Sequence, residues 1–331
     1  QFEKAWRRWR VRAHTAVDAA FELMELGVKS GCEYIDVQAS WPTARIEQLV
    51  AAKQNSKVVA SHHDLTGRLE WASPAARDLY DSLAKFGDVV RIASHASALL
   101  DTLDMMRFRE SVAKGGKPLM TLNTGAEGQL SRILSPILGP VTHPLLPAPA
   151  ESGPVTFAEV QTALHLMGRT PKKQFYLFGT PIAHSKSPLL HNTAFGLLGL
   201  PHHYGLLESA TITDELRAAI RDPAFGGASV TIPHKLEIMP LLDEISVQAT
   251  IIGAVNTIVP FERDGVTKLR GDNTDFIGLR ELLQGNLSSD NELDDKSTSL
   301  VLGAGGTCRA AVYALHACGF KTSALLFTCL S

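Results

Sequence analysis

Four short polar segments in the second half of the sequence carry side chains that could hold a small polyhydroxylated molecule. In single-letter code they are SKSP (residues 185–188), SVTIPHK (229–235), GAVNT (253–257) and GDNTD (271–275). Their hydroxyls, amides and carboxylates supply alternating hydrogen-bond donors and acceptors, which suit a ring bearing several hydroxyl groups. Taken alone, each segment also has an ordinary explanation. Lys235 could be a solvent-exposed lysine, and the Asn- and Asp-rich turns could cap the local backbone.

Two residues in the first half could act on a charged ligand. His63 follows the apolar run KVVAS, and a histidine there could be a general acid or base because imidazole titrates near neutral pH. Arg132 follows a glycine-rich loop, residues 125–128, and a guanidinium in this place can bind a carboxylate through two parallel hydrogen bonds. The alternatives are a structural histidine at a strand end and a surface ion pair.

A third candidate site is a glycine turn in the last part of the sequence. The segment LVLGAGGTCRAA (residues 300–311) predicts a strand, a tight turn and a helix. Glycines let the backbone approach a pyrophosphate, and the start of a helix favours its negative charge. A glycine pattern alone is only weakly specific. The candidate cofactor-binding residues are Gly303, Gly305, Gly306, Thr307 and Arg309.

The elements that must position these residues alternate between strands and helices. Residues 1–30 have apolar side chains at helical spacing. Short β-branched and apolar runs follow at Tyr34–Ala39, Lys57–Ser61, Asp88–Ala93, Leu119–Asn123 and Val141–Leu145. Helix-like segments separate the first four runs, which predicts βαβ units and a parallel sheet. The fold class is therefore α/β, with part of a (β/α)8 barrel whose chemistry lies just beyond the strand ends.

The second half also predicts an α/β domain. A strand begins at Phe175, and Pro188 suits the start of a helix at Leu189–Leu198. A strand is predicted at His203–Leu207, and a helix at Asp214–Arg221 with Thr213 as its N-cap. A helical stretch at residues 155–167 leads to the boundary, and residues 286–299 form a polar, acidic linker. We predict three domains: residues 1–168, 169–285 and 286–331.

Composition places the chain among ordinary globular proteins. It has 331 residues, 45% of them hydrophobic and 20% charged, and a net charge of -2, which predicts no nucleic-acid interface. The early basic residues Lys4, Arg7, Arg8, Arg10 and Arg12 are better explained as a solvated helix face. The four cysteines lack metal-ligand spacing and suit a reducing compartment. Because of that spacing we expect no metal site. With no signal peptide and no long apolar run, we expect no membrane contact and a location in the cytoplasm or nucleus.

The first half of the sequence resembles the type I 3-dehydroquinate dehydratase family. The matching pieces are YIDVQASWP (34–42), KVVASHHD (57–64), GDVVRIA (87–93), GAEGQLSRILSP (125–136) and VTHP (141–144). The resemblance covers about residues 15–165. It implies a barrel in which His63 is the catalytic histidine and Arg132 binds the substrate carboxylate. The strands that precede Tyr34 in the family are not found, so we expect the chain to begin within this domain.

Two positions depart from that family. Arg91 stands where the family has the lysine whose amine forms a Schiff base with the substrate ketone. A guanidinium stays protonated and is a poor nucleophile, so we expect the positive charge to remain and the covalent chemistry to be lost. Pro154 stands where the family has a glutamine that contacts the substrate, and proline offers no side-chain hydrogen bond.

The four polar segments, in this order, resemble the substrate domain of shikimate dehydrogenase over about residues 174–327. The resemblance implies that Lys235 and Asp275 move the proton at a ring oxygen. It implies that the polyhydroxy acid is held by Ser185, Ser187, Thr231, Asn256 and Asp275. Ser229 departs from the family, which has asparagine there. The glycine turn matches the family's NADP loop. Because the sequence stops soon afterwards, we expect a truncated coenzyme domain that does not hold NADP productively.

The order of the two domains resembles two kinds of fungal protein. One is the C-terminal part of the catalytic arom polypeptide, and the other is the quinate repressor, a sensor built from related domains. Arg91 and Pro154 favour the repressor and disfavour a bifunctional dehydratase and dehydrogenase. The repressor resemblance implies a regulator that senses quinate, dehydroquinate, dehydroshikimate or shikimate. It would contact the transcriptional activator of the quinate pathway and would not bind DNA directly.

Overall fold

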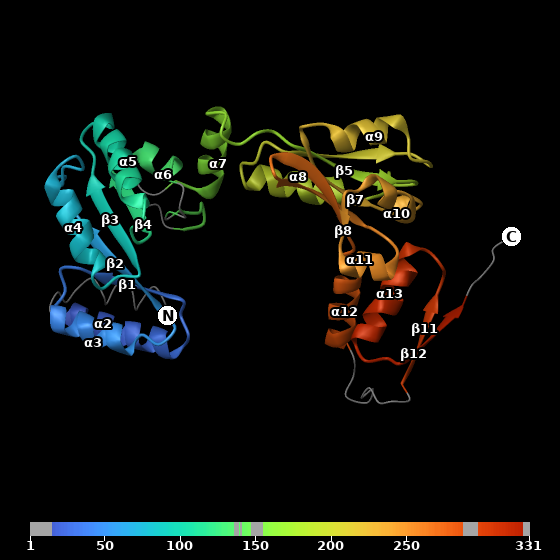
Figure 1. Cartoon of the computed structure of the whole chain (residues 1–331), viewed down its shortest axis with the longest axis horizontal. Coiled ribbons are helices and arrows are strands. Elements are labelled where there is room, and N and C mark those ends of the chain that lie inside the picture. Colours follow the sequence, from blue (N-terminus) through green and yellow to red (C-terminus); the bar gives the residue numbers. More distant parts are fainter. Residues whose placement is uncertain (1–14, 136–138, 140, 147–154, 287–296, 327–331) are drawn as a thin grey trace. The chain divides into compact units, whose positions relative to one another are not determined.

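The computed structural model describes residues 15–135, 139, 141–146, 155–286 and 297–326 (Figure 1). The chain divides into two compact units, residues 1–164 and 165–331. Both are α/β structures with mostly parallel sheets, as the sequence predicts. The early basic cluster, Pro154 and the acidic part of the linker at residues 287–296 lie outside the described residues.

The first unit contains a parallel sheet with the strand order β1-β2-β3-β4 (Figure 1). The strands are Tyr34–Gln38, Lys57–His63, Val89–His95 and Leu119–Thr124. The helices are α2 (Thr15–Lys29), α3 (Thr43–Ala52), α4 (Pro74–Ala84), α5 (Leu99–Ala113), α6 (Gln129–Ile133) and α7 (Phe157–Leu166). These elements confirm the first four predicted strands and the helix-like segments between them.

The fifth predicted strand, Val141–Leu145, is wrong. Where the structure describes this segment, its only pairing is an isolated bridge between Thr142 and Thr156. Pro144 explains the difference, because proline has no N–H to donate to a ladder and interrupts the run after three residues.

The two faces of the first sheet differ in character, because successive side chains of a strand point to opposite sides. One face packs into the core, with Val37, Val58, Val90 and Ile92 fully buried. On β3, Arg91 alternates with these core residues and lies in register with Ser61 of β2 and Met120 of β4. The polar candidates of this unit therefore share the opposite face.

The second unit contains a six-stranded mixed sheet with the order β6-β5-β7-β9-β10-β8. The strands in chain order are β5 (Gln174–Gly179), β6 (His203–Glu208), β7 (Phe225–Val230), β8 (Glu244–Ile245), β9 (Thr257–Arg263) and β10 (Val266–Asp272). The helices are α8 (Ser187–Leu197), α9 (Asp214–Arg221), α10 (His234–Glu237), η1 (Met239–Leu241), α11 (Val247–Ile252) and α12 (Asp275–Asn286). The glycine turn joins β11 (Thr298–Leu302) to α13 (Gly306–Ala317), and β12 (Thr322–Leu326) pairs with β11.

The predicted helix cap in the second half is confirmed. Thr213 caps α9, and its side chain accepts a hydrogen bond of 3.2 Å from the Leu216 N–H. The core of the sheet is formed by fully buried side chains that include Phe178, Leu216 and Ile258.

Among the described residues no helix is long and apolar enough to cross a bilayer, and no cluster of side chains is arranged to hold a metal ion.

Candidate functional site

The polar face of the first unit holds two linked pairs of side chains. The Arg91 guanidinium donates a hydrogen bond of 2.8 Å to the Asp36 carboxylate, across the sheet from β3 to β1. The His63 ring lies 2.9 Å from the amide oxygen of Gln38. The sequence reasoning did not foresee Asp36 or Gln38, because their role depends on register between strands. Arg91 is therefore a paired cation, at the position where the family resemblance implies a lysine that forms a Schiff base.

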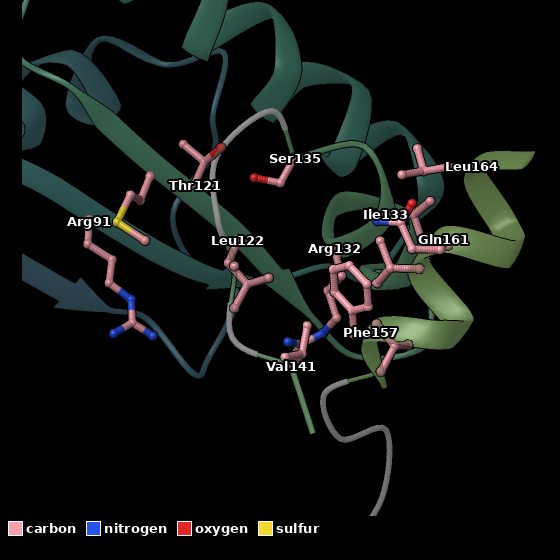
Figure 2. A pocket seen from close by; sticks show the side chains of 14 residues that line it. Arg91, Thr121, Leu122, Arg132, Ile133, Ser135, Val141, Phe157, Gln161 and Leu164 are labelled. Atoms are coloured by element: carbon pink, nitrogen blue, oxygen red, sulfur yellow. The ribbon is translucent and has the colours of Figure 1, made fainter. Parts of the chain in front are cut away.

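A cavity of about 240 Å³ is lined by both Arg91 and Arg132. Figure 2 shows Arg132 beside Val141 and Phe157, with Arg91 at the other end of the cavity. The Arg132 Nε and one terminal nitrogen are buried and have no hydrogen-bond partner among the described residues. Burial lowers the pKa of Arg132. A desolvated guanidinium without a partner is a suitable place for an anionic group, because charge-assisted hydrogen bonds are strong there.

The surroundings of His63 favour the neutral form of its imidazole. Burial is the main cause of its lowered pKa, and the positive charge of Arg91 lowers the pKa further. The Asp36 carboxylate acts in the opposite direction but does not cancel these effects. A neutral imidazole can accept a proton, so His63 retains the protonation state that a general base requires.

The Arg91→Met variant is expected to raise the pKa of His63, because it removes a nearby positive charge and leaves the Asp36 carboxylate in place. An NMR titration of the histidine ring resonances measures this change. The matched control is Arg77→Met, which removes an exposed arginine paired with Asp81 on α4. Equal His63 pKa values in wild type and Arg91→Met would show that Arg91 does not influence the ring.

A buried network holds α6, the short helix that carries Arg132. The Trp71 indole donates a hydrogen bond of 2.9 Å to the Asn123 side chain, whose amide in turn donates to Thr102 at 3.2 Å. The Ser131 hydroxyl accepts a bond of 2.9 Å from the Asn123 backbone N–H. Asn123 thus connects the end of β4 to the residue directly before Arg132.

Replacing Asn123 by alanine is expected to lower the free energy of unfolding by about 1–3 kcal/mol, because the buried Trp71 N–H loses its acceptor. Urea denaturation measures the loss. Asn55→Ala, at an exposed position, is the control and should change little. If the two variants lose the same stability, the network does not contribute as described.

The four polar segments of the second unit meet at one edge of its sheet. Parallel strands β5 and β7 both end there, and antiparallel β9 begins there. The Val230 N–H donates to the Asn256 carbonyl at 2.7 Å, and the Asn256 N–H donates to the Asp272 carbonyl at 3.0 Å. Gly179 permits the close approach of β5 to Thr231, because a side chain there would lie 2.4 Å from the Thr231 methyl group and its φ is +149°.

Lys235 and Asp275 form an ion pair at this edge. The Lys235 Nζ donates to one oxygen of Asp275 at 2.5 Å, and the Asn256 side-chain amide donates to the other oxygen at 2.6 Å. The Lys235 side chain is 9% exposed and that of Asp275 is 25% exposed. Buried Asn273 fixes the turn, because its side chain accepts from the Asp275 N–H at 3.1 Å and donates to the Ala254 carbonyl at 3.0 Å.

The remaining predicted ligand-binding residues lie at the same edge without joining this pair. The Ser185 hydroxyl accepts from the Ser187 N–H at 3.2 Å, and the Thr231 N–H donates to the Phe178 carbonyl at 2.8 Å. Among the described residues no hydrogen bond links Ser185, Ser187 or Thr231 to Lys235 or Asp275. Tyr204 on β6 is not among the predicted site residues. Burial is the main cause of its raised pKa, and the hydroxyls of Ser229 and Ser187 act in the opposite direction.

The glycine turn reaches the lysine directly. The Thr307 hydroxyl accepts a hydrogen bond of 3.0 Å from the Lys235 Nζ. Gly303 has a φ of +119°, and a side chain on it would meet the Cys308 sulfur at 2.8 Å, so glycine is required in this turn. Arg309 is exposed, and its guanidinium lies beside Gly253 at the end of α11. The turn and the start of α13 provide backbone N–H groups of the kind that bind phosphate.

Comparison with known proteins supports the same division of the chain. Residues 6–171 match the family model of type I 3-dehydroquinase, and residues 177–258 match that of the shikimate dehydrogenase substrate binding domain. The chain is 48% identical over 305 residues to a pentafunctional AROM polypeptide of Mycosarcoma maydis, covering 91% of this chain and 18% of that protein. It is 47% identical over 307 residues to the AROM polypeptide of Malassezia globosa, covering 92% of this chain and 19% of that protein.

A solved structure supports the fold. The chain resembles the dehydroquinate dehydratase and shikimate dehydrogenase of S. pombe AroM with a TM-score of 0.78 and 42% identity, covering 95% of this chain and 59% of that one. The chain thus spans less than a fifth of the length of the curated relatives it matches. It belongs to the type I 3-dehydroquinase family, and its second unit is homologous to the shikimate dehydrogenase domain of pentafunctional AROM polypeptides.

Proposed function

We propose that the second unit binds a shikimate-type polyhydroxy carboxylate and takes part in its NADP-linked oxidation and reduction. The observation that carries this proposal is the shielded Lys235–Asp275 pair, whose carboxylate is fixed by Asn256. This pair differs from an ordinary surface ion pair, which is exposed to solvent and contributes little to stability. A lysine and a carboxylate held at 2.5 Å at a strand edge suit proton transfer to or from a bound hydroxyl.

The chemistry of the pair follows from its hydrogen bonds. The Lys235 ammonium group has three N–H donors, of which Asp275 and Thr307 accept two. The third can bind the reacting ring oxygen. When the alcohol is oxidised, its O–H proton passes to the Asp275 carboxylate, because the Lys235 ammonium group has no free electron pair to accept it, and reduction returns the proton to the oxygen. The coenzyme would supply the hydride chemistry at the carbon that bears this oxygen, with NADP+ as hydride acceptor and NADPH as hydride donor.

The residues of the glycine turn fit a dinucleotide phosphate, and we propose this binding in place of the expectation, from the sequence, that NADP is not held productively. Gly303 adopts a backbone conformation that favours glycine, and a side chain at Gly306 would press on Lys235. These glycines leave the first backbone N–H groups of α13 open to an anion. Gly303, Gly305, Gly306 and Thr307 would hold the phosphates. We assign no contact to Arg309, because its side chain lies toward α11.

The first unit is proposed to bind a carboxylate without forming a covalent intermediate. Arg132 offers a desolvated guanidinium at the cavity, and His63 provides a neutral imidazole on the same face of the sheet. Arg91 preserves the positive charge of the lysine it replaces and cannot form the imine.

A second candidate function is a metabolite-sensing repressor, and the Arg91–Asp36 pair favours it. A sensor needs the ligand pockets of both units but neither covalent chemistry nor hydride transfer. Such a protein would bind quinate, dehydroquinate, dehydroshikimate or shikimate and contact a transcriptional activator of quinate catabolism. Both functions require binding of a polyhydroxy carboxylate, but only the dehydrogenase would oxidise or reduce it.

Incubating the full chain with shikimate and NADP+ separates the two functions. The dehydrogenase proposal expects reduced coenzyme to form only when shikimate is present, and expects the Asp275→Asn variant to abolish it. Binding of shikimate without coenzyme reduction supports the sensor. If shikimate neither binds nor reacts, both proposals for the second unit are wrong.

A further inference from the structure

Thr307 links the glycine turn to the proton-transfer pair. It lies in the first turn of α13, whereas Lys235 lies in α10, 72 residues earlier. The Lys235 Nζ donates to the Thr307 hydroxyl at 3.0 Å and to Asp275 at 2.5 Å. A residue of the turn that would hold the coenzyme phosphates therefore touches the group that would move the substrate proton.

The backbone of the turn also packs on the lysine. A side chain at Gly306 would place its Cβ 3.1 Å from the Lys235 Cδ, 3.2 Å from the Lys235 Cβ and 3.4 Å from the Ala254 Cβ. The turn thus packs closely against the stem of Lys235 and the GAVNT segment, and a methyl group at Gly306 would require these neighbours to shift. A shift of the turn would change the position of the Thr307 hydroxyl relative to Lys235.

The Thr307 hydroxyl can form hydrogen bonds to Lys235 and to a bound phosphate at the same time. Its oxygen accepts from Lys235, which leaves its own O–H free to donate. A phosphate oxygen at the start of α13 is a strong acceptor for that proton. Binding of a dinucleotide phosphate would then orient the hydroxyl so that its lone pair faces the ammonium group.

We propose that Thr307 is a positioning residue that couples occupancy of the glycine turn to the placement of Lys235 in the substrate site. The inference rests on the proposed function. By linkage, a ligand that fixes the turn tightens binding of the polyhydroxy acid, and the acid tightens binding of the dinucleotide by the same factor. Coupling of this kind requires only that both ligands favour the same arrangement of the turn and the lysine.

Calorimetry on the full chain tests the coupling by titrating shikimate with and without saturating NADPH, a pair that cannot react because both molecules are already reduced. For wild type we expect NADPH to tighten shikimate binding by about fivefold or more. Thr307→Ser keeps the hydroxyl and should keep this ratio. Thr307→Val keeps the shape without the hydroxyl, and at an NADPH concentration that saturates this variant its ratio should fall to about one.

Each other outcome has a defined meaning. A Thr307→Val variant that keeps the wild-type ratio overturns the inference, as does a wild-type protein that binds shikimate with no effect of NADPH. If Thr307→Val does not fold, as shown by its thermal unfolding curve, Thr307→Ala is compared with Thr307→Ser by the same criterion. Failure of wild type to bind shikimate at all overturns the proposed function instead.

Discussion

Lys235→Met is expected to lower kcat for NADP-linked oxidation of shikimate by about 10²–10⁴-fold, the usual contribution of a positioned acid–base group. Methionine keeps an unbranched side chain of similar length but removes the only cation that is hydrogen-bonded to Asp275 among the described residues. Affinity for shikimate should change much less, because Ser185, Ser187 and Asn256 remain. Steady-state kinetics and calorimetry on the same preparation separate the two effects.

The matched control is Lys172→Met, at an exposed lysine before β5. It should leave both kcat and affinity unchanged. Thermal unfolding of the Lys235→Met protein must be followed as well, because breaking a shielded ion pair can cost several kcal/mol. A folded Lys235→Met protein that turns over like wild type would exclude Lys235 from proton transfer.

No covalent adduct is expected when the chain is treated with 3-dehydroquinate and borohydride, and no dehydration of that compound is expected. The Arg91 guanidinium is paired with Asp36 at 2.8 Å, and it lacks the free amine that attacks a ketone. Intact-mass spectrometry after reduction reports the adduct, and the formation of dehydroshikimate reports turnover.

The matched variant for this experiment is Arg91→Lys, which supplies an amine at the same place on β3. An adduct in this variant but not in wild type would show that the cavity still orients the ketone and that only the nucleophile is missing. A trapped adduct or measurable dehydration in wild type would contradict the account of the first unit.

Features with a local cause were predictable from the sequence. The strands β1 to β4 and the cap at Thr213 depend on short patterns of apolar and capping residues, and the structure contains them. The strand predicted at residues 141–145 is wrong because Pro144 interrupts its β-branched start and cannot donate a hydrogen bond to a neighbouring strand.

Features that depend on register or on distant packing were not predictable. The four polar segments could be predicted as site residues, because each lies next to a strand end, where ligand sites of α/β proteins are common. Their contacts with distant residues could not. The pairing of Arg91 with Asp36 likewise depends on the order of β1, β2 and β3, and the Lys235–Thr307 hydrogen bond joins residues 72 positions apart. Sequence patterns do not show which distant residues are in contact. From the sequence, Thr307 was therefore predicted to bind only the coenzyme.

The central claim is that a polyhydroxy acid binds at the sheet edge formed by the SKSP, SVTIPHK, GAVNT and GDNTD segments. Calorimetric titration of the full chain with shikimate tests it most directly, using wild type, the Ser185→Ala/Ser187→Ala double variant and the exposed control Ser30→Ala. The account predicts that wild type and Ser30→Ala bind alike. It predicts that the double variant binds at least about tenfold more weakly, because two hydroxyl contacts are lost. Equal heats for all three proteins, or no binding by wild type, would contradict the claim.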